Sequence, residues 1–495
     1  MLPRLLFAAL AALAALAIPA ARADAGPTPC RVEGLKNEVL CGHVTRALDP
    51  AQPAGRTIDV HYLVVPATAR RKASDPVFFL AGGPGQSAIA LAGSVTPLLL
   101  RLGNQRDLVF VDQRGTGRSA ALACDDEDDE HRPLAERIDL QRMVERLRAC
   151  RARLAAQPHG DLRQYTTTIA MADLDAVRAA LGAERINLVG GSYGTRAALE
   201  YLRQFPQRVR RAVLDGVAPP DMALSASMSA DAQRVLDAQF DACERDAACA
   251  ARHPRLRERF RAWLASLPRE VEVTDPQTGD AQRLRLTREA VLSALRGPLY
   301  APAMAAALPE ALGAAIEGRV TPLAGLGSLG LGGRRLRLAE IEHFAVVCAE
   351  DMPRLAASAD RPGADLGESL AQPYRALCAD WPRSEVPAAF YAIAPSPAPV
   401  LLFSGGLDPV TPPRHGERVA RALGAKARHV VVDNAGHGVM ALGCARDLIH
   451  RFIASDDEAQ ALAVDATCLA AIPRPPVFRP ADPALAPTTA PGGRS

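Results

Sequence analysis

A five-residue segment, Gly-Gly-Ser192-Tyr-Gly at positions 190–194, constrains the fold more than any other feature of the chain. The apolar run 186–189 before it is typical of a buried strand, and the run 195–202 after it has a helical pattern. A Gly-x-Ser-x-Gly turn between a strand and a helix exposes the serine at the helix N-terminus, where N–H groups favour developing negative charge. Ser192 is therefore the candidate nucleophile, and the alternative is an ordinary turn, because glycine and serine are common turn residues.

A serine nucleophile needs a base that accepts its proton and an acid that orients the base. In hydrolases with this motif, the acid comes after the serine in the chain, and the histidine comes after the acid. His437, in a glycine-flanked loop after the apolar strand 430–432, is the candidate base. Asp408, after the predicted strand 399–403, is the candidate acid, and Asp433 is its rival. We prefer Asp408, because an acid on a neighbouring strand end can approach the histidine loop from the side.

Two backbone N–H groups are expected to bind the oxyanion of the reaction. Tyr193, directly after the nucleophile, supplies one of them. The other is expected from the glycine-rich loop 81–85, which follows the apolar strand 77–80. Gly83 is the preferred donor and Gly82 is possible, because glycine lets the backbone approach a substrate oxygen closely.

These motifs together resemble the prolyl-aminopeptidase family of serine peptidases, which has the α/β-hydrolase fold. The resemblance rests on Gly-Gly-Pro-Gly at 82–85, Asp-Gln-Arg-Gly-Thr-Gly-Arg-Ser at 112–119, the Ser192 motif, Asp408 and the glycines beside His437. Ser-Tyr-Gly-Thr, a large insertion and the C-terminal block make it closest to the secreted bacterial tripeptidyl-aminopeptidase-like branch. It spans about residues 30–475.

The resemblance implies removal of a tripeptide or a single proline from the N-terminus of peptides, through an acyl-enzyme on Ser192 and without a metal or cofactor. Many relatives have a histidine where Ala81 stands, but the glycines of the expected oxyanion hole are present. An esterase or amidase acting on small apolar molecules is the alternative activity. A non-catalytic binding protein on a hydrolase scaffold is the more remote one.

An aminopeptidase must bind a free α-ammonium, which favours carboxylates near Ser192. Glu350 and Asp351, close to Cys348, are the candidates, and an exposed charge pair at a helix end is the alternative. The charged, glycine-containing segment 112–119 lacks the Gly-Lys-Ser/Thr of a phosphate loop. The hypothesis there is that Asp112 and Arg114 shape the loop beneath the oxyanion hole.

The N-terminus has the pattern of a secretory signal peptide, with Arg4, an apolar run over 5–18 and Ala-Arg-Ala at 21–23. We expect cleavage after Ala23, and an uncleaved anchor is the alternative. Removing residues 1–23 deletes two arginines and no acid, so the formal charge falls from +3 to +1. Such a chain gives no electrostatic argument for binding nucleic acid or an anionic membrane. No later run predicts a stable membrane anchor, and the oligomeric state stays open.

Ten cysteines in an exported chain suggest disulfides. Sequence alone does not determine their pairing, and we prefer pairing between neighbours because each such pair falls inside one local segment. The predicted pairs are Cys30–Cys41, Cys124–Cys150, Cys243–Cys249, Cys348–Cys378 and Cys444–Cys468. Metal binding is the alternative, but there is no Cys-x-x-Cys and the histidines are scattered. We expect the protein to reside in an oxidising compartment, either the periplasm or the outside of the cell.

The alternation of strands and helices predicts a mostly parallel eight-stranded sheet with helices on both faces. This core comprises residues 24–220 and 396–475, and a mainly helical cap over 221–395 is inserted between them. One hairpin is expected around 275–279 inside the cap. Residues 476–495 are predicted to be a disordered tail.

Overall fold

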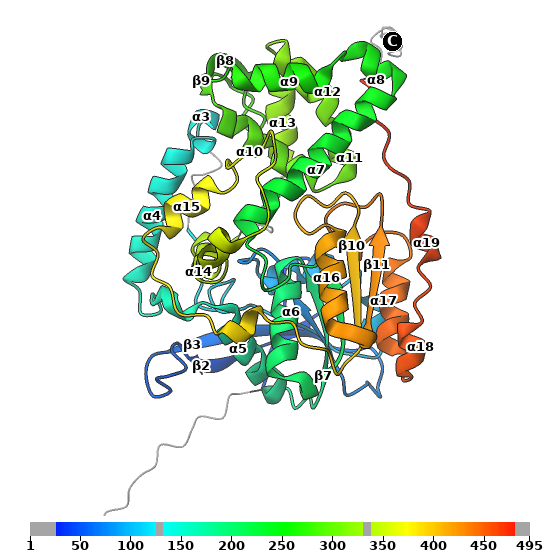
Figure 1. Ribbon diagram of the computed structural model, residues 1–495. Helices are drawn as coiled ribbons and strands as arrows, with labels where there is room; N and C mark the ends of the chain where they lie inside the picture. The colour runs from blue at the N-terminus through cyan, green and yellow to red at the C-terminus, as the bar shows by residue number, and fades with distance from the viewer. Residues whose placement is uncertain (1–25, 125–131, 330–337, 481–495) are drawn as a thin grey trace, which may run out of the picture.

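The structure, a computed structural model, describes residues 26–124, 132–329 and 338–480 (Figure 1). The predicted signal peptide, residues 1–23, lies outside these ranges. A nine-stranded sheet has the order β1-β2-β3-β5-β4-β6-β7-β10-β11. Its strands are β1 (Thr28–Cys30), β2 (Val39–Ala47), β3 (Thr57–Val65), β4 (Val77–Leu80), β5 (Leu108–Val111), β6 (Ile186–Gly191), β7 (Val209–Asp215), β10 (Val400–Gly405) and β11 (Ala427–Val432).

The sheet has one more strand than the eight that the sequence predicts. Neighbouring strands are parallel from β5 to β11 in sheet order. The three remaining pairs, β1–β2, β2–β3 and β3–β5, are antiparallel. The additional strand is the edge strand β1, which has only three residues. It pairs with β2 and is joined to it by the Cys30–Cys41 disulfide, so it depends on tertiary contacts that a three-residue pattern cannot reveal.

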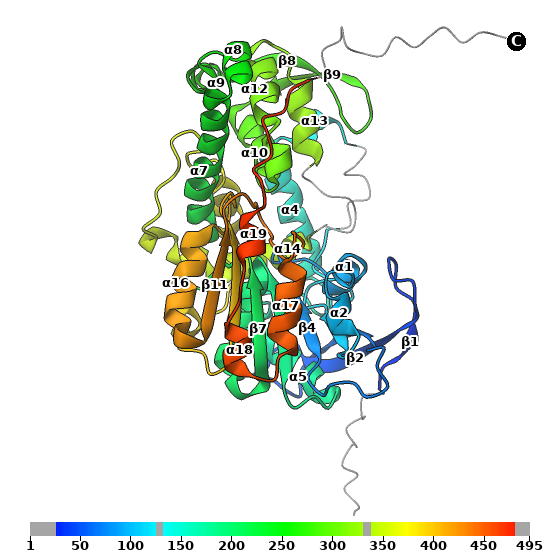
Figure 2. The same cartoon turned by 90° about the vertical axis from the view of Figure 1, so that its right-hand side faces the viewer.

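Helices cover both faces of the sheet, and each face has its own hydrophobic core. Central strands such as β4 and β5 are buried along their whole length, as parallel strands between two helical layers are. One face carries α5 (Thr167–Ala180), α6 (Tyr193–Gln204) and α16 (Pro413–Leu423). The other carries α1 (Ala88–Val95), α2 (Leu100–Gly103) and α17 (Ala445–Ala454), followed by α18 (Glu458–Leu462) and α19 (Thr467–Ala470) (Figure 2).

A mainly helical layer lies over the end of the sheet at which the parallel strands finish (Figure 1). Most of it is inserted between β7 and β10. Its residues 232–323 share a separate apolar core, whereas residues 341–348 and 374–378 belong to the core on one face of the sheet. Its elements are α7 (Leu224–Arg245), α8 (Ala247–Arg252), α9 (Leu256–Ala265), β8 (Arg269–Thr274), β9 (Ala281–Leu286), α10 (Arg288–Leu299), α11 (Pro302–Ala305), α12 (Leu308–Ile316), α13 (Thr321–Leu329), α14 (Glu340–Glu350) and α15 (Gln372–Cys378). The β8–β9 hairpin confirms the turn expected at 275–279.

Two helices that precede Ser192 in the chain also join this layer. They are α3 (Leu134–Arg137) and α4 (Leu140–Ala155), and α4 packs against α14 and α15 (Figure 1). The sequence division had assigned their residues to the core. Their placement means that the roof over the strand ends is built from two separate parts of the chain.

All five predicted disulfides are present, and together they use the ten cysteines. The sequence predicts a disordered tail from residue 476, but the first residues of this segment are held in place. The Phe478 N–H donates to the Ala306 carbonyl, and Arg479 pairs with Asp246, so the chain is held against α8 and α11 at these residues. Residues 481–495 lie outside the described ranges. No helix in the described parts of the chain combines the length and apolar character needed to cross a membrane.

Candidate active site

Ser192 stands at the junction of β6 and α6 in a strained backbone conformation. Its φ of 55° and ψ of −123° are rare for a residue with a side chain. The neighbouring glycines make the turn possible, because a Cβ on Gly190 would lie 2.4 Å from the Gly194 carbonyl oxygen. A Cβ on Gly194 would lie 2.1 Å from the carbonyl oxygen of Leu80. Such a turn presents a nucleophilic side chain above the sheet.

Asp408 and His437 come from the loops after β10 and β11, and their side chains meet. The Nδ1 of His437 lies 2.8 Å from the Oδ2 of Asp408. Burial lowers the pKa of His437, but the Asp408 carboxylate outweighs it, and the net pKa is above its usual value. Burial likewise raises the pKa of Asp408, and the His437 charge and hydrogen bonds reverse that effect. The pair is therefore built to stabilise an imidazolium.

The Asp408 carboxylate is fully buried and is oriented by its own loop. Its Oδ1 accepts the N–H groups of Val410 and Thr411, each at 2.8 Å. The Thr411 hydroxyl donates to Oδ2 at 2.8 Å and lies 3.1 Å from Nδ1 of His437. Asp408, rather than its rival Asp433, thus has the position of the orienting acid.

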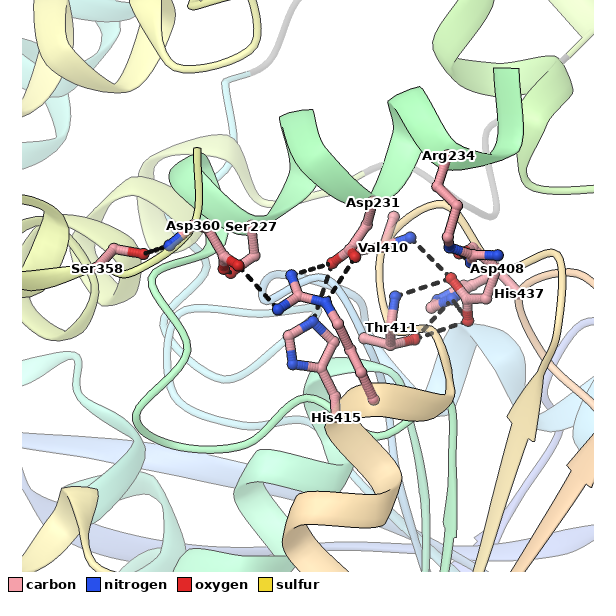
Figure 3. A network of polar contacts seen from close by, with 11 residues as sticks. Ser227, Asp231, Arg234, Ser358, Asp360, Asp408, Val410, Thr411, His415 and His437 are labelled. Carbon is pink, nitrogen blue, oxygen red and sulfur yellow. Dashed lines mark hydrogen bonds and ion pairs between the residues drawn. The ribbon is translucent and has the colours of Figure 1, made fainter. Parts of the chain in front are cut away.

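The cap helix α7 holds the Asp408 loop from above (Figure 3). Arg234 donates to the carbonyl oxygens of Gly406 at 2.8 Å and of Asp408 at 3.0 Å. One turn earlier, Asp231 accepts from Nε2 of His415 at 2.9 Å, at the start of α16. Cap and core are therefore joined by charged contacts beside the Asp408–His437 pair.

The predicted oxyanion donors Gly83 and Tyr193 line the same cavity as Ser192 and His437. Gly82 also borders Ser192, since a Cβ on it would lie 3.2 Å from the serine Cβ. Asp112 holds the start of α1, directly after this loop: its Oδ1 accepts from the Ser87 hydroxyl at 2.7 Å and from the Ile89 N–H at 3.0 Å. This geometry agrees with the loop-shaping role expected of Asp112.

The sequence also matches a known family. Residues 75–443 match the family model of the alpha/beta hydrolase fold. The chain belongs to the alpha/beta hydrolase fold family. The sequence is 27% identical over 430 residues to serine protease Hip1 of Mycobacterium tuberculosis, covering 80% of this chain and 82% of that protein. It is 32% identical over 212 residues to tripeptidyl aminopeptidase of Streptomyces lividans, covering 41% of this chain and 40% of that protein.

Among solved structures, an alpha/beta hydrolase enzyme from a Medee basin deep-sea metagenome library is similar to this chain, with a TM-score of 0.34 and 15% identity. That similarity covers 77% of this chain and 88% of the other. The peptidase names among the sequence relatives agree with the resemblance that the motifs carry.

In this α/β hydrolase, Asp215 connects the nucleophile turn to the histidine loop, a role that the sequence analysis missed. Its carbonyl oxygen accepts the Ser192 N–H at 2.8 Å. Its carboxylate accepts the N–H groups of Val439 and Met440 at 2.8 Å. Burial raises the pKa of Asp215 to about 6, although these hydrogen bonds oppose the shift. The signal available in the sequence is an acid followed by glycine at the end of an apolar strand.

The geometry does not support Glu350 and Asp351 as binders of a substrate ammonium. Both oxygens of Asp351 accept from the Arg196 guanidinium, at 2.9 and 3.1 Å. Glu350 accepts the Thr167 N–H at 2.7 Å and its hydroxyl at 3.0 Å, and burial raises the pKa of Glu350 to about 7. Glu350 does not reach the cavity surface, although Asp351 does. The two carboxylates instead neutralise a buried arginine beneath the site.

The cavity between cap and core has a volume of about 1770 Å³. Typical pockets for small ligands hold about 300–1,000 Å³. Apolar side chains from the cap, such as Met228, Leu323 and Leu370, face it together with the catalytic candidates. Among the described residues, no group of three or more His, Cys, Asp or Glu side chains is arranged to hold a metal ion.

Proposed function

We propose that this α/β hydrolase is an exported serine peptidase that removes short units, a tripeptide or a single proline, from the N-terminus of peptides. The observation that carries the proposal is the hydrogen-bonded Asp408–His437 pair in one cavity with the strained Ser192 turn. Relatives named serine protease and tripeptidyl aminopeptidase support the peptidase class.

In the proposed reaction, Ser192 Oγ attacks the carbonyl carbon of the scissile bond while His437 accepts the serine proton. Asp408 holds the histidine tautomer with Nε2 free and stabilises the imidazolium that forms. The N–H groups of Gly83 and Tyr193 bind the oxyanion. His437 then gives its proton to the leaving amine, and water releases the acyl group from Ser192 by the reverse sequence.

The size of the cavity supports a peptide substrate. At about 1770 Å³ it exceeds what a single small acyl group fills, and it offers both apolar and charged walls. The roof formed by the cap restricts access from one side. A peptide that enters with its end first fits such a space better than the middle of a long extended chain.

Export is supported by the five disulfides, which persist in oxidising compartments. The proposal includes removal of residues 1–23. N-terminal sequencing of the protein recovered from the periplasm or the medium is expected to begin at Asp24. Recovery with the N-terminus of the full chain intact would contradict cleavage at that site.

The experiment that tests the activity compares the mature protein with its Ser192→Ala variant on four substrates. They are a proline arylamide, a free-amine tripeptide arylamide, the N-blocked form of the same tripeptide arylamide, and a short-chain ester. Ser192-dependent cleavage of a free-amine amide, with the blocked form resistant, is the expected result, and the products show how many residues leave. Turnover of the ester alone would replace the peptidase with an esterase, and turnover that survives Ser192→Ala would remove Ser192 from the mechanism.

A further inference from the structure

Arg296 stands in the last turn of α10 and faces the cavity that holds Ser192 and His437. Its side chain is exposed to water, because the space in front of it is the cavity itself. The polar groups beside its guanidinium include the phenols of Tyr300 and Tyr374. These groups are uncharged at neutral pH, so they do not neutralise the guanidinium.

The other arginines at the cavity wall have carboxylate partners. Arg137 pairs with Asp275 at 2.5 Å, Arg146 with Glu340 at 4.0 Å and Arg196 with Asp351 at 2.9 Å. Within the described residues, Arg296 makes no such pair. Glu289 is the nearest acid on its own helix, and seven residues of α-helix separate the two by about 10 Å along the axis. A guanidinium that faces the cavity without a counter-ion is available to an anionic ligand.

Arg296 is connected to the catalytic histidine through Tyr300, which follows it by one helical turn. The Tyr300 carbonyl oxygen accepts the His437 N–H at 2.9 Å. The Tyr300 ring meets the His437 ring edge to face, with centroids 5.1 Å apart. Because His437 delivers the proton to the departing amine, the wall next to it borders the leaving-group side of the substrate.

Arg296 is also connected to the oxyanion loop, through Tyr374 and His343. Burial, aided by the nearby Arg296 charge, lowers the pKa of His343 to about 4, so its imidazole is neutral. The Pro84 carbonyl oxygen can only accept, which places the His343 proton on Nδ1, 3.0 Å away. The Tyr374 hydroxyl then donates to Nε2 at 3.2 Å, and Tyr374 also lies beside Arg296. Arg296 thus lies between the two sides of the site.

We infer that Arg296 binds a carboxylate of the substrate on the leaving-group side of the scissile bond. A guanidinium without a carboxylate partner keeps N–H groups available for a planar, bidentate anion. Two sources supply that chemistry: the C-terminal carboxylate of a short leaving peptide, and an acidic side chain just after the scissile bond. The inference rests on the proposed function and specifies which peptides that function prefers.

The test measures kcat/KM for three free-amine tetrapeptides that differ only after the scissile bond. One ends in a carboxylate, one in an amide, and one in an amide with an aspartate as the leaving residue. For the wild type, one of the two acids is expected to exceed the neutral amide, and which one identifies the source. Arg296→Gln is expected to lower that preference about 10- to 100-fold, since hydrogen bonds to charged groups are of this size. Arg296→Lys is expected to restore part of it.

Arg146→Gln is the matched control, because it removes one positive charge from the same cavity wall where a carboxylate partner is present. It is expected to keep the preference of the wild type. Thermal unfolding of each variant checks that the fold is kept. Equal losses on all three peptides in Arg296→Gln would show a purely structural role through Tyr300 and Tyr374, and would overturn the inference.

A failure of the proposed function gives a different result. If no peptide is cleaved in a Ser192-dependent way, kcat/KM is compared for two esters instead. The esters share one acid, and only one of their two leaving alcohols carries a carboxylate. A preference for the charged alcohol that Arg296→Gln abolishes would retain the Arg296 site while the peptidase proposal falls. Absence of any preference in the wild type, with peptides or esters, would overturn the Arg296 site itself.

Discussion

The main-chain carbonyl of Asp215 accepts the N–H of Ser192 at 2.8 Å, while the side chain of the same residue holds the backbone just after His437. One residue at the end of β7 therefore sets the position of two loops that must meet. The candidate serine and histidine come from loops after different strands, and Asp215 joins these loops through three accepted N–H groups.

Asp215→Asn is expected to lower kcat while leaving KM nearly unchanged. The Val439 N–H donates to both carboxylate oxygens and the Met440 N–H to Oδ2, so an amide with its NH2 group in the place of Oδ1 loses one acceptor and sets a donor against the Val439 N–H. The same loss is expected to lower the free energy of unfolding by about 1–3 kcal/mol. Steady-state kinetics and denaturant unfolding measure both. A variant with wild-type kcat would show that Asp215 only fills space.

The raised pKa of Asp215 predicts a pH effect on stability of its own. The folded protein holds this proton up to about pH 6, whereas an unfolded aspartate releases it near 3.8. The folded state therefore binds more protons in that window, and the contribution of Asp215 to stability falls as pH rises from about 4 to about 6. Urea unfolding of the wild type is expected to show this fall in the free energy of unfolding across the window. In Asp215→Asn, which has no carboxyl group to titrate at this position, the contribution of residue 215 to the fall is expected to be absent.

Asp408→Asn is expected to reduce kcat about 10³- to 10⁴-fold with little change in KM. The amide no longer stabilises the imidazolium and it favours the wrong tautomer of His437. Kinetics on any substrate that the wild type turns over measure the loss, and Asp433→Asn is the control for a nearby acid without this contact. Equal activity losses in the two variants would contradict the assignment of Asp408.

The pH profile of kcat/KM is expected to rise with pH through the ionisation of His437. The base must be neutral to accept the serine proton, and Asp408 raises its pKa above the usual 6.5 in spite of burial. Activity is thus lost on acidification below that raised pKa. In Asp408→Asn the midpoint of the residual activity is expected to move to lower pH. A wild-type midpoint below 6.5 that Asp408→Asn leaves in place would contradict the coupling.

Much of the site could be predicted from the sequence because its parts are local. Ser192, Asp408 and His437 each follow an apolar strand, and parallel strands end at one edge of a sheet. The strand pattern alone therefore predicts that the three loops meet. The five disulfides were predictable for the same reason, since each closes a loop of 6 to 30 residues.

Contacts between distant segments could not be predicted in this way. Glu350 and Asp351 look like a free acidic pair in the sequence, yet Arg196, more than 150 residues earlier, neutralises them. Likewise, α4 has the amphipathic pattern of an ordinary sheet-covering helix, but it packs against α14 and α15. Side-chain periodicity reports which face of a helix is buried and not which partner buries it.

Removing one of the two carboxylates that neutralise the buried Arg196 is expected to destabilise the fold. Asp351→Ala leaves the guanidinium with only Glu350, at 3.5 Å, to offset its charge. Breaking a buried ion pair typically costs about 3–5 kcal/mol. Denaturant unfolding measures this, with the exposed pair Arg283–Glu272 as the control, for which Glu272→Ala is expected to cost less than about 1 kcal/mol. A small loss in Asp351→Ala would mean that water or Glu350 replaces the missing partner.

Gly194→Ala is expected to abolish activity and to destabilise the protein. The added methyl group would lie 2.1 Å from the Leu80 carbonyl oxygen and 2.9 Å from that of Ala81, and both contacts are with backbone that cannot rotate away. The strand β4 must therefore shift relative to α6, which moves the oxyanion loop away from Ser192. Gly325→Ala in α13 is the matched control, because its methyl group meets nothing within 4 Å, and helix propensity favours alanine by about 1 kcal/mol. Ser192-dependent turnover and thermal unfolding of the two variants separate the effects. If Gly194→Ala kept wild-type turnover, the close approach of β4 to the Ser192 turn would not be required for catalysis.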